Sequence, residues 1–185
     1  MVSLLVVFYI FVILFSIIGV IRGWAQELIV TFSVILAFFL INIVEEYILE
    51  NYVSEAFILN PSRQFLIRGG IIALLVFFGY QTPRISRFAA AMRKNRISDS
   101  FFGFFLGGIN GYLITGSMWY YLASAGYPIK YFVDPNTLLN IEQLSESAEA
   151  SIEFVNMLPP VWLATEPGIY IAIGLTFLFV VMVFI

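Results

Sequence analysis

The chain has 185 residues, of which 61% are hydrophobic and 11% are charged. A soluble domain has about 45–50% apolar and about 25% charged residues, and a chain of this size exposes too much surface to hide such an excess in one core. The mean hydropathy of +0.96 therefore predicts an all-α integral membrane protein whose main partner is the lipid bilayer. The formal net charge of −3 argues against nucleic acid as a partner.

The sequence contains neither Cys nor His. Disulfide bonds, thiolate nucleophiles, His-containing metal sites and imidazole acid–base chemistry are therefore excluded. No Ser–His, Asp–Asp or metal-binding arrangement is visible among the other residues, so we expect no enzyme activity and predict no catalytic residue, cofactor or metal.

Two apolar segments begin the chain, at residues 2–21 and 28–44. A helix needs about 20 apolar residues to cross the hydrocarbon core, so both predict membrane spans, the second at the short limit. Arg22 and Glu27 lie in the turn expected between them, at residues 22–27, and are the only charged residues among the first 44. We expect these charges to anchor the ends of the two helices; a polar site for a partner or substrate is the alternative.

A third span is predicted at residues 65–80, after an acidic segment. Arg68 lies in its first turn, from where the long side chain can reach back to the lipid headgroups. Basic residues then alternate with apolar ones in the segment 82–99, at Arg84, Arg87, Arg93, Lys94 and Arg96. This pattern is typical of an amphipathic helix on an anionic membrane surface. A dedicated partner site is the alternative.

Residues 100–124 predict a fourth span, and residues 168–185 predict a fifth. The segment between them is polar and acidic, and its apolar residues at helical spacing predict an amphipathic interfacial helix that ends at Pro159 and Pro160. The expected architecture is thus about five membrane helices. The chain divides into a four-span membrane domain at 1–125, an acidic segment at 126–167 and a C-terminal transmembrane helix at 168–185.

The distribution of Lys and Arg predicts the orientation of these spans. The turn after the first span and the segment 82–99 lie on one side and together hold six basic residues. The other side holds Arg63, Arg68 and Lys130. We therefore expect the N-terminus outside, the C-terminus inside and the acidic segments in the extracytoplasmic space.

The fourth span carries small and polar residues on one helical face, because each residue turns the helix by about 100°. This face comprises Asp99, Gly103, Gly107, Asn110, Gly111 and Ser117. Small residues at four-residue spacing let helix backbones approach closely, and an Asn can hydrogen-bond across such a contact for about 1 kcal/mol. We interpret the stripe as a packing seam, within one chain or between copies in a homo-oligomer. A polar pathway through Asp99, Asn110 and Ser117 is the alternative. We also expect Asp99 to lie near Arg22.

The turn and the stripe together resemble the colicin V production protein family (CvpA-like). The family's turn motif, Gly-x-x-Arg-Gly-x-x-x-Glu, is matched by Gly19, Arg22, Gly23 and Glu27. Its second signature, an Asp followed by regularly spaced Gly residues, is matched by Asp99, Gly103, Gly107 and Gly111. Ser100 and Asn110 stand where the family usually has Arg. The resemblance covers residues 1–125.

This resemblance implies a multi-pass protein of the bacterial cytoplasmic (inner) membrane that supports colicin V type toxin production or secretion, or envelope homeostasis. It implies no catalytic residue and makes a secretion or envelope protein an expected partner. A small oligomeric transporter or channel subunit is the alternative function. The few charges in the predicted spans argue against ion conduction by one copy, because transport pathways usually contain buried ionisable groups. An oligomer around the fourth span could still form a pathway.

Overall fold

A computed structural model of the chain describes residues 4–49, 60–81, 96–125 and 153–184. The regular elements in these ranges are all helices, as the composition predicts. In chain order they are α1 (Leu4–Arg22), α2 (Trp24–Ile43), the π-helix η1 (Val44–Leu49), α5 (Pro61–Gln81), α7 (Arg96–Ser124), α9 (Pro159–Leu163) and α10 (Gly168–Phe184).

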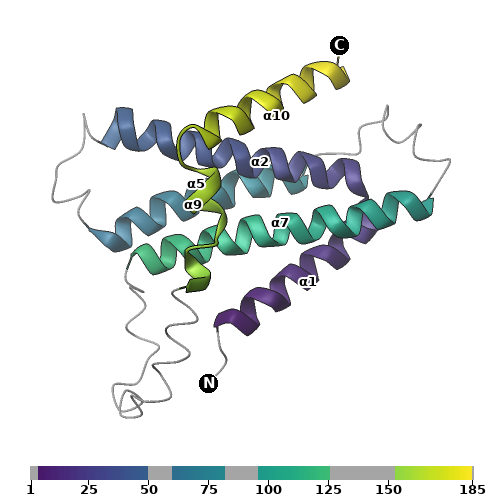
Figure 1. The fold of residues 1–185 in the computed structure, drawn as a ribbon, viewed down its shortest axis with the longest axis horizontal. Coiled ribbons are helices and arrows are strands. Elements are labelled where there is room, and N and C mark those ends of the chain that lie inside the picture. The colour runs from purple at the N-terminus through teal and green to yellow at the C-terminus, as the bar shows by residue number, and fades with distance from the viewer. Residues whose placement is uncertain (1–3, 50–59, 82–95, 126–152, 185) are drawn as a thin grey trace, which may run out of the picture.

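The helices α2, α5 and α7 run side by side, and α1 crosses α7 at an angle (Figure 1). The helix α10 packs on the outer side of α2, and the short α9 contacts both α7 and α10. The end of α1, the start of α2, the end of α5 and the start of α7 gather at one end of the molecule, on the right of Figure 1. The residues of both predicted motifs therefore come from elements that meet at this end.

Among the described residues, three helices are long and apolar enough to cross a membrane: Leu4–Arg22, Trp24–Tyr47 and Pro61–Gln81. These correspond to the first three predicted spans. The helix α7 is long enough, with 29 residues, but is not one of these three. The apolar helix Gly168–Phe179 is shorter than a typical span. The fourth and fifth spans and the orientation of the chain stay predictions.

The break between α1 and α2 is a single residue, Gly23, and not the turn expected over residues 22–27. Gly23 has φ 85°, a left-handed conformation that L side chains rarely adopt. The space around Gly23 also leaves no room for a side chain, since a Cβ atom there would lie 2.5 Å from Oδ1 of Asp99. The chain can therefore reverse within one residue, and α2 begins inside the predicted turn.

Other boundaries also differ from the expected ones. Pro61 begins α5, where the missing N–H of proline costs no hydrogen bond, so this helix starts before the predicted residue 65. Pro159 likewise begins α9, after the preceding helical turn has ended. Four basic residues of the segment 82–99 and most of the acidic segment lie outside the described residues, as do the amphipathic helices predicted there; the four are Arg84, Arg87, Arg93 and Lys94.

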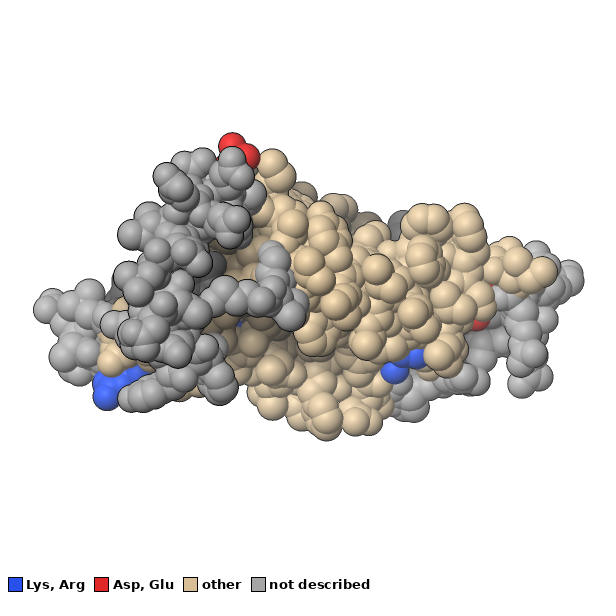
Figure 2. All heavy atoms as spheres, turned by 90° about the horizontal axis from the view of Figure 1, so that it is seen from below, with Lys and Arg blue, Asp and Glu red and all other residues tan. Residues whose placement is uncertain are grey.

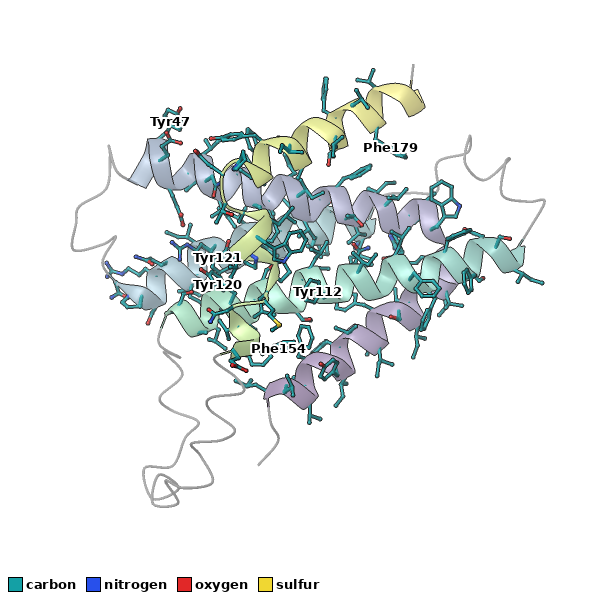
Figure 3. All side chains as sticks on the ribbon, in the orientation of Figure 1. Tyr47, Tyr112, Tyr120, Tyr121, Phe154 and Phe179 are labelled. Carbon is teal, nitrogen blue, oxygen red and sulfur yellow. The ribbon has the colours of Figure 1, made fainter. Side chains whose placement is uncertain are left out.

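The core of the molecule lies along one face of α2. Buried residues recur on α2 at helical spacing, at Glu27, Val30, Val34, Ala37, Phe38 and Ile41. They pack against Ile72 of α5 and Ile169 of α10, which are also fully buried. Phe179 of α10 adds an edge-on ring contact with Phe32, with the centroids 5.2 Å apart (Figure 3).

Large apolar side chains cover much of the outer surface. On α1 the side chains of Ile10, Ile13, Ile17 and Ile21 are 54–73% exposed. The described residues on the face seen in Figure 2 are almost entirely uncharged. Soluble monomers rarely expose apolar patches of this extent, so the surface is suited to lipid.

Candidate functional site

The two charged residues at the α1–α2 break pair with each other. Nε of Arg22 donates to Oε1 of Glu27 at 2.9 Å. The side chain of Glu27 is 0% exposed and that of Arg22 is 19% exposed, so the pair is largely removed from solvent. The sharp reversal at Gly23 makes this possible, because it places the last residue of α1 beside the first turn of α2. Loss of either partner would leave an uncompensated buried charge.

Asn110 of α7 completes the surroundings of the Glu27 carboxylate. Its side-chain nitrogen donates at 2.8 Å to Oε2 of Glu27 and at 2.8 Å to the backbone oxygen of the same residue. The side-chain oxygen of Asn110 accepts a hydrogen bond of 2.7 Å from the hydroxyl of Thr31. Asn110 is 0% exposed. These bonds join α7 to the first turns of α2.

Tyr80 connects the same cluster to α5. Its backbone oxygen accepts a hydrogen bond of 2.9 Å from Nη1 of Arg22, and its hydroxyl lies 3.5 Å from Oε2 of Glu27. The guanidinium carbon of Arg22 is 4.6 Å from the centre of the Tyr80 ring, a cation–π distance. We call this cluster the polar centre; it comprises Arg22, Glu27, Thr31, Tyr80 and Asn110. It joins all four helices that gather at this end of the molecule.

Asp99, in the first turn of α7, lies at the α1–α2 break as expected, but it does not pair with Arg22. Its Oδ1 accepts a hydrogen bond of 3.1 Å from the backbone N–H of Trp24, the first residue of α2. A carboxylate at this position satisfies a free N–H of the helix terminus and interacts favourably with the helix dipole. Arg22 is instead engaged by Glu27 and Tyr80.

The glycine stripe of α7 faces α1 of the same chain. A Cβ atom at Gly19 would lie 2.0 Å from the backbone oxygen of Gly103, and one at Gly107 would lie 2.4 Å from that of Phe15. At Gly111 it would lie 2.9 Å from Cα of Val12. The four glycines thus allow two helix backbones to touch, which supports the interpretation as a packing seam. A homo-oligomer stays a prediction. A contact between copies through α7 would have to use a face of this helix that α1 does not cover.

The alternative interpretation of the stripe was a polar pathway. Asp99 bonds to Trp24, and Asn110 bonds to Glu27. The hydroxyl of Ser117 donates to the backbone oxygen of Leu113 in its own helix. These three residues therefore bond to three separate partners, and none of these hydrogen bonds links one of them to the next along a pathway.

Sequence reasoning missed Thr31 and Tyr80, which look like ordinary residues of apolar spans. It also missed a second ion pair at the opposite end of the helices. Nε of Arg68 donates to Oε1 of Glu45, and its guanidinium carbon lies 5.3 Å from the ring centre of Tyr121. Arg68 is therefore held by the protein and does not simply extend to the headgroups. The signal was present, because Glu45 directly follows the second predicted span and Arg68 lies in the first turn of the third.

The described part of the chain contains no group of three or more acidic side chains placed to hold a metal ion. No protein-family model, no curated protein and no solved structure matches the chain. The resemblance to colicin V production proteins therefore rests on the two motifs alone, and membership of that family stays a prediction. What the structure adds is that the residues of the turn motif, Asp99 and Gly103 lie together where four helices meet, and that Gly107 and Gly111 continue the contact along α1.

Proposed function

We propose that the chain is a non-catalytic, multi-pass protein of the bacterial inner membrane that supports toxin production or secretion, or envelope homeostasis. The observation that carries this proposal is the buried Arg22–Glu27 pair and its bonds to Asn110. These bonds, the Asp99 contact and the glycine seam involve every residue of the two family-like motifs. Their shared role is to hold the α1–α2 hairpin against α5 and α7.

A membrane location follows from the surface and from the three apolar helices. In this proposal α7 is a fourth span, since 29 residues at 1.5 Å each exceed a hydrocarbon core of about 30 Å. The helix α10 is a fifth span at the short limit of length. The basic segment faces the cytoplasm, which places the N-terminus outside.

A non-catalytic role is supported by how the charged groups are used. The carboxylate of Glu27 is fully buried, and both of its oxygens accept hydrogen bonds from other helices. Both oxygens of the carboxylate are thus engaged in holding the fold. A protein that organises partners in the membrane needs this kind of fixed helix arrangement and needs no reactive side chain.

The experiment is deletion of the gene in its own bacterium, followed by complementation. We expect the deletion to reduce secretion of a colicin V type peptide or to increase sensitivity to detergent, and the wild-type chain to restore the phenotype. Glu27→Ala should restore it poorly, whereas Ile13→Leu, on the exposed face of α1, should restore it fully. Unchanged secretion and detergent resistance in the deletion strain would refute the proposal.

The second candidate is a small oligomeric transporter or channel subunit. The observation that favours it is again the buried Arg22–Glu27 pair, because ionisable groups inside helix bundles commonly mark transport pathways. Flux measured in proteoliposomes separates the two functions. Flux that disappears in Glu27→Gln would favour the transporter, and the absence of flux across a panel of ions and metabolites would favour the supporting role.

A further inference from the structure

The first half of α1 is held mainly by one aromatic side chain. Among residues 4–12, all of which the structure describes, the only buried residue is Phe8, which is 5% exposed. Its ring packs against Tyr112 and Trp119 of α7, with centroids 6.1 and 5.9 Å away, and against Phe154, at 5.1 Å. Figure 3 shows Phe154 between α7 and the start of α1. The nearest of these three rings therefore comes from the C-terminal part of the chain.

Phe154 begins a short segment, residues 154–159, which we call the strap. Leu158 of the strap is fully buried, and Leu158 and Pro159 lie over Gly116 of α7. A Cβ atom at Gly116 would lie 2.9 Å from Cδ of Pro159 and 3.2 Å from Cδ2 of Leu158. The strap thus fits into a notch on α7 that exists because Gly116 has no side chain.

These contacts form a second, smaller core that is distinct from the main core along α2. Its buried residues are Phe8, Trp119 and Leu158, and none of them belongs to the main core. Tyr112 packs against both cores, and its hydroxyl donates to the backbone oxygen of Met157 in the strap. Regions with few buried apolar contacts open locally at a lower free energy than the whole fold. The second core is therefore suited to open while the main core stays closed.

The second half of α1 is held in a different way. At Gly19, Gly107 and Gly111 the backbones of α1 and α7 touch, and this seam extends to Val12. Toward the chain start the two helices diverge (Figure 1). An apolar cavity of about 400 Å³ lies there between α1, α5 and α7, so the side of α1 that borders it lacks close packing. The glycine seam is thus a fixed point about which the first half of α1 can move once Phe8 is released.

The strap leads directly into the C-terminal helices. The helix α9 begins at Pro159, and the backbone oxygen of Ala164, just after it, accepts a hydrogen bond of 3.0 Å from the side-chain nitrogen of Asn42 in α2. Ile169, in the first turn of α10, is fully buried in the main core. The C-terminal end of the strap is therefore fastened to the main core independently of α1.

From these observations we propose that the strap is a releasable clamp on α1. While Phe154 lies against Phe8, the first half of α1 is held on α7. When the strap leaves, the second core opens and this half of α1 pivots about the glycine seam, while the polar centre and the main core stay intact. The position of α1 is thereby controlled from the C-terminal part of the chain. The clamp does not depend on the function proposed above.

The test measures two distances in the full chain by pulsed electron paramagnetic resonance. Spin labels are attached to introduced Cys residues, since the chain has no Cys of its own. One label is at Leu74 of α5, and the other is at Val6, near the start of α1, or at Ile21, near its end; these side chains are 56%, 49% and 73% exposed. SDS is then added stepwise to the protein in mild detergent. We expect the Val6–Leu74 distance to broaden at a lower SDS fraction than the Ile21–Leu74 distance.

Two variants then test the strap itself. Phe154→Ala removes the ring that touches Phe8 and should move the first transition to a lower SDS fraction, with the Ile21–Leu74 transition unchanged. Met157→Ala is the matched control. Its side chain also belongs to the strap but is 66% exposed, so both transitions should stay where they are in the wild type.

The clamp is refuted if both distances of the wild type change in one common transition, because α1 then leaves α7 only when the whole fold is lost. Wild-type transitions in Phe154→Ala would also refute it, since the strap would then not hold α1. Equal shifts of both transitions in this variant would make the strap an ordinary part of the main fold. A shift of the Val6–Leu74 transition alone, absent in Met157→Ala, is the result that supports the clamp.

Discussion

The side-chain amide of Asn110 donates to both the carboxylate and the backbone carbonyl of Glu27, although the two residues are 83 positions apart in the chain. One amide group thereby fixes the position of α7 against α2 and orients the carboxylate that binds Arg22. The bond to the carboxylate is charge-assisted and lies in a buried site, which strengthens it.

Removing the carboxylate should be the most damaging change in the polar centre. We expect Glu27→Ala to lower the free energy of unfolding by about 3–5 kcal/mol, because it leaves Arg22 buried without its counter-charge. Denaturation in mixed micelles with increasing SDS measures this. The double variant Arg22→Met/Glu27→Leu is the control, because it removes both charges and should recover most of the loss. A double variant as unstable as Glu27→Ala would show that the ion pair is not the cause.

The second ion pair should matter less. Arg68 is 23% exposed and Glu45 is 35% exposed, so solvent screens their interaction. We expect Glu45→Gln to cost less than about 1 kcal/mol in the same unfolding assay. Glu27→Gln, measured beside it, should cost more. Equal losses would mean that burial does not distinguish the two pairs.

The helix seam predicts a sharp difference between two glycines. Gly19→Ala places a methyl group 2.0 Å from the backbone of Gly103, whereas Gly70 has no atom within 4 Å of such a group. We expect Gly19→Ala to destabilise by about 1–3 kcal/mol through overpacking. Gly70→Ala should be neutral or stabilising by up to about 1 kcal/mol, since Ala favours helix more than Gly. Thermal unfolding in detergent compares them, and similar melting temperatures would contradict the seam.

The contact at the start of α2 predicts a moderate effect. Asp99→Ala removes the acceptor for the N–H of Trp24 and should cost about 1 kcal/mol. Asp99→Asn keeps an acceptor and should lose only part of this. The unfolding assay again provides the measurement. If Asp99→Ala behaved like wild type, the hydrogen bond would have no role in stability.

Much of the fold could be predicted because the signals are local. Runs of apolar residues give the helices α1, α2 and α5, and the four-residue glycine spacing indicates a close helix contact. The chain reversal at Gly23 could not be located so well, because neither its positive φ nor its closeness to Asp99 of α7 is visible in the local sequence. A local pattern therefore predicted a longer turn.

The partners within the site were harder to predict. Asp99 was expected near Arg22, and it lies against the next two residues, Gly23 and Trp24, whereas the counter-charge of Arg22 is Glu27, five positions along the chain. The contributions of Thr31 and Tyr80 depend on the rotation of α2 and α5 about their axes. Helix rotation is decided by packing between spans, and a sequence of uniformly apolar residues contains little information about it.

The single-residue break at Gly23 also has a consequence for biogenesis. Arg22 and Glu27 belong to one helical hairpin, so their charges can neutralise each other as soon as α1 and α2 have left the ribosome. A neutral hairpin enters the bilayer at lower cost than two separate spans that each carry a charge. Tyr80 and Asn110 are synthesised later and join an ion pair that already exists. The ion pair therefore needs only residues of the first two helices, and the contacts from α5 and α7 are added to it afterwards.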